Sequence, residues 1–173
     1  MDEALADARA VFSSFPEPIF DLWLDDRIRQ SGWPPNGIDW NGYLDGRTIA
    51  YWQALNWMRT RTSVKVEELS HNSLALVGQI TAAAAGVANA VSCYIPNTAE
   101  RFRSCLQFIQ QNATTPGTVI LHRSEAGLFI VDGNHRIAAL LAVQSQLSTS
   151  ASPLLFDAWI ATPLLERKSQ ARS

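Results

Sequence analysis

The stretch LFIVDGNHRIAALLA, residues 128–142, decides how this chain is expected to fold. A run of strand-forming apolar residues stops at Asp132 and Gly133, and apolar residues then recur at helical spacing from Ile137. This pattern predicts a β-strand that leads through a glycine turn into an α-helix beginning near Asn134. Gly133 has no Cβ atom, so it permits an unusual backbone angle or the close approach of a ligand.

Two further patterns precede this junction. Residues 118–122 (TVILH) and 127–131 (GLFIV) are short β-rich runs, and polar residues separate them. Such spacing predicts a β-hairpin. Residues 97–112 (NTAERFRSCLQFIQQN) repeat apolar side chains at helical spacing after an N-cap candidate at Asn97 or Thr98, which predicts a helix.

Flanking segments extend this expected α+β fold. Residues 62–69 (TSVKVEEL) alternate apolar and charged side chains, which predicts a half-buried strand with Val64 and Val66 facing the core. Residues 154–161 (LLFDAWIA) predict one more strand. Residues 72–91 predict a helix, although two glycines weaken it.

The first 61 residues differ from the rest because they hold five of the six tryptophans. Amphipathic patterns predict helices at 2–15, 17–32 and 47–61, and Gly32 is a candidate C-cap. The expected organisation is a helical N-terminal extension at 1–61, an α+β core at 62–161 and a basic tail at 162–173.

The tryptophans of this extension fall into two groups. Trp23, Trp52 and Trp57 lie at helical spacing, and we expect them in the core. Trp33 and Trp40 lie in a segment rich in glycine and proline, and they are candidates for an interface or for base stacking.

Composition bounds the function. Hydrophobic residues make up 47% and charged residues 17% of the chain, and the net charge is −2, which argues against a broadly basic nucleic-acid surface but not against a local basic patch. No run approaches the roughly 20 apolar residues of a membrane span, and the acidic N-terminus does not resemble a signal peptide, so we expect a cytoplasmic protein. Cys93 and Cys105 are expected as free thiols. The three histidines show no zinc-binding spacing.

The polar residues of the junction suit phosphate chemistry. A helix N-terminus offers unpaired N–H groups and the positive end of the helix dipole, and Arg136 adds donors that fit phosphate oxygens. His135 can donate a hydrogen bond or transfer a proton near neutral pH. Asp132 would repel phosphate, but it can hold a metal-bound water, a ribose hydroxyl or the Arg136 head group. Residues 133–136 therefore predict a nucleotide or phosphodiester site.

A purely structural interpretation of the same residues also stands. Asp132 can cap the helix or pair with Arg136, and His135 can be an ordinary surface residue.

The motif VDGNHRIAAL, residues 131–140, after a hairpin and before a helix, resembles the signature of the ParB/sulfiredoxin superfamily. The segments SVKVEEL (63–69), ERFRSCLQFIQ (100–110) and FDAWIA (156–161) resemble that family's first strand, the helix before its hairpin and a later strand. The resemblance covers roughly residues 62–161 and implies a small mixed sheet with helices, with a nucleotide bound at the helix N-terminus by Gly133, Asn134, His135 and Arg136.

Departures from the family narrow the implied activity. Asn134 stands where sulfiredoxin has its catalytic cysteine, which argues against reductase chemistry. Only about a dozen residues follow FDAWIA, so we expect no helix-turn-helix of the partitioning type. Among the compact members that remain, the chain most resembles plasmid-encoded fertility-inhibition proteins of the Osa type in size and layout. That resemblance implies ATP hydrolysis and DNA cleavage, directed against DNA transfer by a rival plasmid through a conjugation or secretion apparatus.

The resemblance also suggests where the remaining groups come from. Glu67 and Glu68 lie near the end of the segment likened to the family's first strand. Glu68, which would share the side of Val64 and Val66, is expected before Glu67 to join Asp132 as a Mg²⁺ ligand or general base for phosphoryl transfer to water. Arg136 and His135 would stabilise the phosphoryl oxygens and the leaving group. A DNA path would use four basic residues before and within the hairpin: Arg101, Arg103, His122 and Arg123.

Three alternatives to an ATP-hydrolysing nuclease come from other classes of protein. The chain can be a non-enzymatic module that senses nucleotide or blocks a partner, or a small-molecule kinase of the ParB-like type. The Fic family also carries a DGN loop, but its motif needs a histidine where this chain has Leu128, and its helical surroundings differ from the β-rich run before Asp132. We therefore reject Fic.

Overall fold

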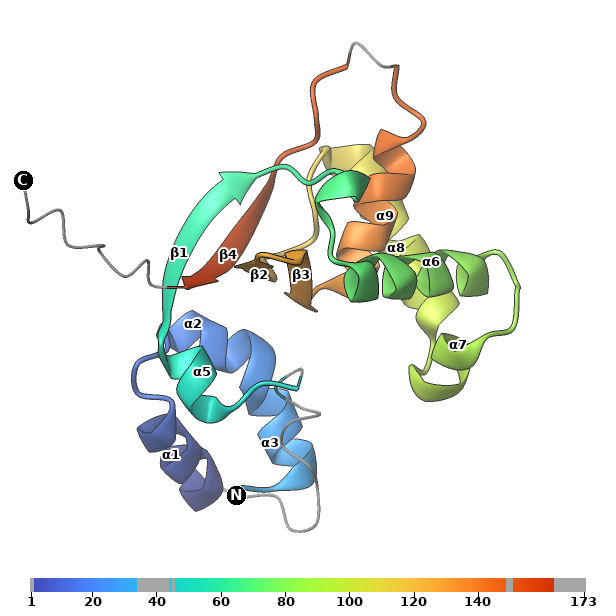
Figure 1. Ribbon diagram of the computed structural model, residues 1–173. Helices are drawn as coiled ribbons and strands as arrows, with labels where there is room; N and C mark the ends of the chain where they lie inside the picture. Colours follow the sequence, from blue (N-terminus) through green and yellow to red (C-terminus); the bar gives the residue numbers. More distant parts are fainter. Residues whose placement is uncertain (1, 34–43, 45, 149–150, 164–173) are drawn as a thin grey trace, which may run out of the picture. The chain divides into compact units, whose positions relative to one another are not determined.

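The computed structural model describes residues 2–33, 44, 46–148 and 151–163 (Figure 1). The chain forms two compact units, Met1–Trp57 with Ala161–Ser173, and Met58–Ile160. Helices and a mixed four-stranded sheet are both present, so the predicted α+β class is confirmed. None of the helices in the described ranges is long and apolar enough to cross a membrane.

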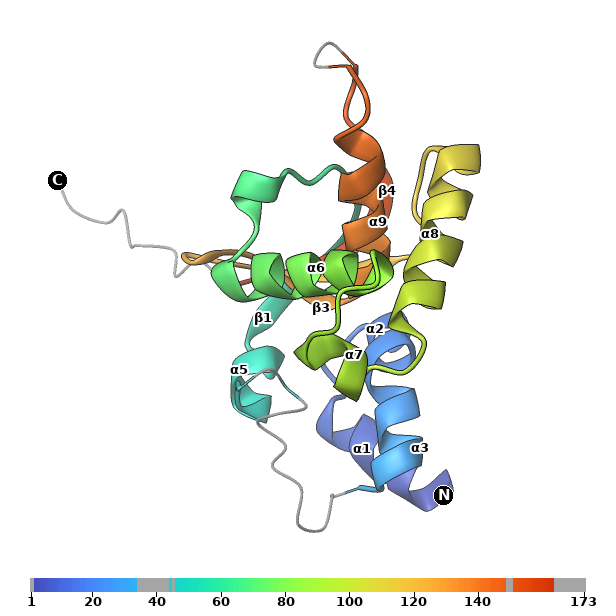
Figure 2. The same cartoon turned by 90° about the vertical axis from the view of Figure 1, so that its right-hand side faces the viewer.

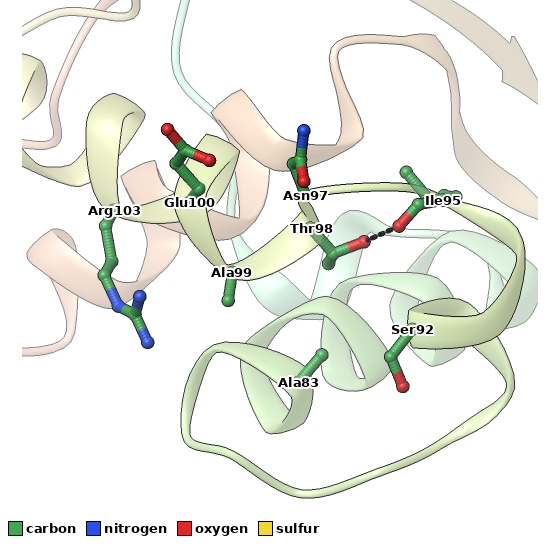
Figure 3. A pocket seen from close by; sticks show the side chains of 8 residues that line it. All are labelled: Ala83, Ser92, Ile95, Asn97, Thr98, Ala99, Glu100 and Arg103. Carbon is green, nitrogen blue, oxygen red and sulfur yellow. Dashed lines mark hydrogen bonds between the residues drawn. The ribbon is translucent and has the colours of Figure 1, made fainter.

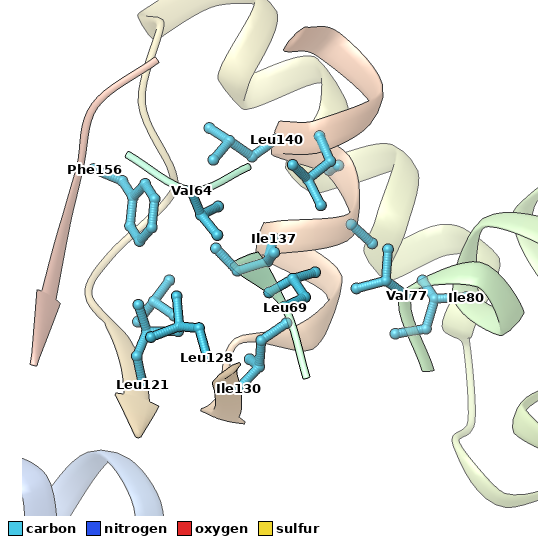
Figure 4. Close-up of a cluster of buried hydrophobic side chains, with 14 of the residues drawn as sticks. Val64, Leu69, Val77, Ile80, Leu121, Leu128, Ile130, Ile137, Leu140 and Phe156 are labelled. Atoms are coloured by element: carbon cyan, nitrogen blue, oxygen red, sulfur yellow. The ribbon is translucent and has the colours of Figure 1, made fainter. Parts of the chain in front are cut away.

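The sheet has the strand order β1-β4-β2-β3. Its strands are β1 (Leu55–Thr62), β2 (Val119–Ser124), β3 (Gly127–Asp132) and β4 (Phe156–Pro163). The predicted hairpin is confirmed, since β2 and β3 pair antiparallel, and the predicted strand at 154–161 is β4. In Figure 4 the arrows of β4 and β2 point the same way.

A bulge shifts the register at the end of β3. Ile120 lies opposite Asp132, but Leu121 lies opposite Ile130, so Val131 is an extra residue in β3. Ile130 and Val131 are both buried as a result. The bulge therefore adds a buried side chain immediately before the chain leaves the sheet at Asp132.

The helices of this second unit are α6 (His71–Ala84), α7 (Ala90–Tyr94), α8 (Thr98–Asn112) and α9 (Asn134–Gln144). The helices predicted at 97–112 and from Asn134 are α8 and α9. Figure 2 shows α8 running beside α9, and α6 lies against β3. The helix predicted over 72–91 is interrupted, because the chain turns at Gly86 with φ +84° and restarts after the Asn89 cap.

The core of this unit surrounds α9 (Figure 4). Ile137 and Leu140 are fully buried, and each such side chain contributes about 1.5–3 kcal/mol. Their partners come from every neighbouring element: Val64, Leu69, Val77, Ile80, Leu121, Leu128, Ile130 and Phe156. The core therefore fixes α9 and, with it, the junction that opens α9.

The edge of β3 is closed by the start of α6. The Ser70 N–H donates to the Leu128 carbonyl over 2.9 Å, and the Ile130 N–H donates to the Ser73 hydroxyl over 2.9 Å. Ser70 also caps α6 by accepting a hydrogen bond from the Ser73 N–H. Both serines are buried.

Two predictions around residue 60 are wrong. The helix expected at 47–61 ends early, because α5 spans only Ile49–Gln53 and β1 follows. The strand expected at 62–69 is a turn of 3₁₀ helix at Val66–Glu68 instead, and Val66 is exposed whereas Val64 is buried. Most side chains of β1 are exposed or half-buried, so no alternation marks the strand in the sequence, and pairing within the sheet overrides the local pattern.

The first unit contains α1 (Asp2–Val11) and a continuous helical segment of α2 (Glu17–Ile19), a π-helical stretch (Phe20–Asp25) and α3 (Asp26–Ser31). This segment confirms the helix predicted at 17–32, and Gly32 is its C-cap with φ +80°. Of the predicted tail, residues 164–173 lie outside the described ranges.

Aromatic rings make the core of the first unit. Trp52 is fully buried, and the centroid of its ring lies 4.8 Å from that of Trp23 and 6.1 Å from that of Trp57. Its indole N–H donates a hydrogen bond to the Leu44 carbonyl. The core role predicted for Trp23 and Trp52 is confirmed, whereas Trp57 is only half-buried. The interface candidate Trp33 packs edge-on against Phe12 at 5.5 Å. The other candidate, Trp40, lies outside the described residues.

Candidate functional site

The first turn of α9 has no side-chain cap. Gly133 occupies the N-cap position with φ 97° and ψ 24°, and no side chain accepts a hydrogen bond from the helix start. The first bond of the helix runs from the Ile137 N–H to the Gly133 carbonyl over 3.0 Å. The N–H groups of residues 134–136 come before Ile137 in the chain, so they have no partner within the helix. They lie at the positive end of the helix dipole.

Glycine at position 133 is required for two reasons. Its positive φ strains any residue that carries a Cβ atom. A Cβ atom there would also lie 3.1 and 3.2 Å from the two γ-carbons of Val119 and 3.4 Å from Nε of Arg136. The junction thus depends on a close approach of β2 to the start of α9.

Arg136 is held in place by two acceptors. Its Nη2 donates to Oδ2 of Asp132 over 2.7 Å, and its Nη1 donates to the carbonyl of Thr118. The side chains of Arg136 and Asp132 are 21% and 33% exposed, so water still reaches the pair. The Asp132–Arg136 pair that the structural interpretation expects is therefore present, and it engages two of the five N–H donors of Arg136 together with the Thr118 carbonyl.

His135 is buried rather than on the surface, because only 8% of the residue is exposed. Burial, together with repulsion from Arg101 and Arg136, lowers the pKa of its imidazole to about 4, and Asp132 partly opposes this shift. The ring is therefore neutral at pH 7, where it can donate or accept a hydrogen bond but does not carry a proton back and forth. Its Nε2 is buried and has no hydrogen-bond partner among the described residues.

Asn134 adds a second buried polar atom without a partner at the same turn. Its Oδ1 makes no hydrogen bond with any described residue. Buried polar atoms are nearly always satisfied in folded proteins, and those that are not call for a specific explanation such as a ligand. Two of them on consecutive residues make the start of α9 a candidate binding site.

Helix α8 contributes a hollow of about 410 Å³ lined by Asn97, Glu100, Arg101, Ser104 and Cys105. Cys105 is a free, half-buried thiol, as predicted. Burial raises the pKa of the Cys105 thiol, while the charges of Arg136 and Arg101 act to lower it. Both arginines therefore act on the same region of α8.

Glu68 does not join this site. Its carboxylate accepts a hydrogen bond from the Lys65 N–H over 2.7 Å, and the next residue, Leu69, pairs with Leu128 near the start of β3. Asp132 ends the same strand four residues later, about 13 Å along it. The structure thus places the two expected metal ligands at opposite ends of β3, and the described residues contain no group of three potential metal ligands.

The four residues predicted for a DNA path are not all on the surface. His122 is only 2% exposed within β2, so the prediction that it lines a surface path is wrong. Arg123 is exposed near the hairpin turn. Arg101 and Arg103 are two residues apart on α8, which turns them about 200° from each other.

Arg103 lines a second hollow, which shares Asn97 and Glu100 with the hollow of Arg101. Its Nη2 donates to the carbonyl of Ala84 at the end of α6 over 3.4 Å. Figure 3 shows it with Ser92 and Ala83 around this second hollow of about 340 Å³. Of the three arginines predicted for the path, only Arg101 acts by its charge on His135 at the start of α9.

Two contributors escaped the sequence analysis. The Thr118 carbonyl orients Arg136, and Gly117, with φ +80°, lies close enough that a Cβ atom there would be 3.7 Å from Nη1 of Arg136. The signal that could have revealed them is the TPG turn immediately before β2.

The chain was compared with known proteins at three levels. No protein-family model, no curated protein and no solved structure matches it.

Proposed function

We propose that this chain binds the phosphate groups of a nucleotide at the start of α9. The observation that carries the proposal is the uncapped first turn of α9, with the buried, unpartnered Nε2 of His135 beside it. The N–H groups of residues 134–136 would hold the phosphate oxygens, and Arg136 would add charge-assisted hydrogen bonds. Neutral His135 would donate one hydrogen bond.

The resemblance to the ParB/sulfiredoxin superfamily extends this proposal to chemistry. It suggests ATP as the nucleotide, hydrolysis of its terminal phosphate by water and cleavage of DNA, in the service of blocking DNA transfer between plasmids. In that reaction water attacks the terminal phosphorus, the bond to the bridging oxygen breaks, and ADP leaves. Residues 133–136 would stabilise the charge that builds on the phosphoryl oxygens.

The metal part of this reaction fits the residues less well. Mg²⁺ prefers carboxylate and phosphate oxygens, and of the two expected ligands only Asp132 lies at the site. One oxygen of Asp132 is already engaged by Arg136, and Glu68 is bonded elsewhere. We therefore assign no step to a metal ion.

The missing second carboxylate favours one alternative, a nucleotide-sensing module that binds without hydrolysis. Both possibilities share the binding site, and they differ in whether phosphate is released.

The test is to measure ATP binding by calorimetry, phosphate release from ATP and nicking of supercoiled plasmid, each with and without Mg²⁺. Wild type is compared with Arg136→Ala and with Arg123→Ala, whose arginine is exposed away from the site. We expect Arg136→Ala to weaken ATP binding at least tenfold and Arg123→Ala to leave it unchanged, with both variants folded by circular dichroism.

The outcomes separate the possibilities. If wild type binds ATP and releases phosphate, and Arg136→Ala abolishes the release, the chain is an enzyme. Binding without release supports the sensing module. If wild type does not bind ATP, or binds it equally well after Arg136→Ala, the proposed site is wrong.

A further inference from the structure

Arg101 is a positive charge beside the proposed site, in a hollow that Glu100 also lines. Its guanidinium makes no hydrogen bond or ion pair with any residue that the structure describes, and the residue is exposed. Arg136, in contrast, is paired with Asp132, so that pair carries almost no net charge. His135 is neutral at pH 7. The positive charge available to a ligand at neutral pH therefore comes from the helix dipole and from Arg101.

The fold brings Arg101 toward the start of α9. Helix α8 packs along α9, and Arg101 lies in its first turns, at the hollow that it shares with Ser104 and Cys105. Its charge acts on His135 in α9 and on Cys105 in α8, and the charge of Arg136 acts on the same two groups. The two arginines thus approach one region from two helices.

We propose that Arg101 is a second phosphate ligand, so that the site takes a chain of linked phosphates, as in a nucleoside diphosphate or triphosphate, rather than a single phosphate. The inference rests on the proposed function. One phosphate would lie on the first turn of α9, and the next would lie over the hollow of α8, where Arg101 and the Ser104 hydroxyl can donate hydrogen bonds. Glu100 lines the same hollow, and its carboxylate repels anions. An anion therefore binds there only if it also bonds to Arg101.

The experiment compares ligands that differ by one phosphate. Binding of inorganic phosphate, pyrophosphate, AMP and ATP is measured by calorimetry in EDTA, for wild type, Arg101→Ala and the control Arg103→Ala. Arg103 is matched to Arg101 because it lies on the same helix, but its guanidinium donates to the Ala84 carbonyl and does not line the hollow of Ser104 and Cys105.

We expect Arg101→Ala to weaken the binding of pyrophosphate and of ATP about tenfold or more, since it removes a charge-assisted hydrogen bond. Phosphate and AMP should change less than twofold, and Arg103→Ala should change none of the four. An equal loss for all four ligands after Arg101→Ala would show a general field effect and overturn the proposal, as would no loss at all.

A second readout uses the thiol in the same hollow. Alkylation of Cys105, followed by mass spectrometry of its peptide at pH 8.5, should slow in the presence of pyrophosphate but not of phosphate, and Arg101→Ala should abolish that protection. Equal reactivity of Cys105 with and without pyrophosphate would contradict the proposed position of the second phosphate. If wild type binds none of the ligands, the proposed function itself fails, and the inference fails with it.

Discussion

The two ends of β3 each carry a glycine with positive φ, 107° at Gly127 and 97° at Gly133, yet they differ in what surrounds them. At Gly127 the neighbouring polar groups are bonded: the Leu128 carbonyl accepts from Ser70, and the Gly127 carbonyl accepts from the Ser124 hydroxyl. At Gly133 the helix start is uncapped and buried polar atoms lack partners. Saturated hydrogen bonding is expected of a structural turn, as at the first end, and the open hydrogen bonding at the second end is the reason for proposing a ligand there.

The largest effect should come from the structural end. A Cβ atom on Gly127 would lie 3.0 Å from the Glu68 carbonyl oxygen and 3.1 Å from the Ser70 nitrogen, and backbone atoms cannot move aside as a side chain can. Because the positive φ adds strain to this crowding, we expect Gly127→Ala to lower the free energy of unfolding by about 3–4 kcal/mol. Urea unfolding measures this. A loss below about 1 kcal/mol would show that the two segments are not locked together.

The ligand end should show itself in a pH dependence. The folded-state pKa of His135 is lowered to about 4 from 6.5, so the unfolded chain binds the proton first as the pH falls. Stability is therefore full above pH 6.5 and declines between pH 6.5 and 4, by at most roughly 3 kcal/mol. Asp132, Arg101 and Arg136 are the charged groups acting on this ring.

His135→Gln is the control for this pH dependence. It keeps a polar side chain but removes the titration, so the difference in unfolding free energy between wild type and variant should shrink on going from pH 7 to pH 4. A constant difference over that range would mean that the imidazole titrates normally.

Gly133→Ala should lower the free energy of unfolding less than Gly127→Ala does, but it should weaken ATP binding more. The added methyl group meets side-chain atoms of Val119 and Arg136, which can shift by a few tenths of an ångström. We expect a loss of about 2 kcal/mol in urea unfolding, from positive φ and partial crowding. ATP binding should fall at least tenfold, whereas Gly127→Ala should leave it unchanged in the fraction that remains folded. The reverse ranking of the two variants in binding would undo the distinction between the ends.

The smallest effect should come from the hydroxyl of Ser73. Ser73→Ala leaves the buried Ile130 N–H and the Ser70 hydroxyl each without an acceptor. The expected loss in unfolding free energy is about 1–2 kcal/mol. Ser92→Ala, which removes an exposed hydroxyl from the cap of α7, provides a comparison that should cost less. Equal losses for both serines would deny a special role to the closed edge of β3.

Local patterns in the sequence predicted the elements that local interactions determine. The hairpin, α8, α9 and β4 follow from residues close to one another in the chain, and so does the pairing of Asp132 with Arg136, one helical turn apart. Long-range packing was beyond those patterns. The position of β1 depends on its pairing in the sheet. Glu68 is expected beside Asp132 only from the layout of the family that the chain resembles, and it lies instead in a 3₁₀ turn.

The candidate site shows the same division. Gly133 and residues 134–136 could be identified from the order strand, glycine, helix. The burial of His135 could not, because helix α8 lies beside it only after folding, and the same packing brings Arg101 to the site. A single helix pair therefore accounts for most of what the sequence did not reveal about this site.

The closed edge of β3 also bears on how this protein would aggregate. An open strand edge is a template on which a second chain can build a β-sheet. Here the Leu128 carbonyl and the Ile130 N–H are occupied by Ser70 and Ser73, at the start of α6. A foreign strand could add to β3 only after that end of α6 has detached, so aggregation by this route would be set by the local opening of one helix rather than by global unfolding.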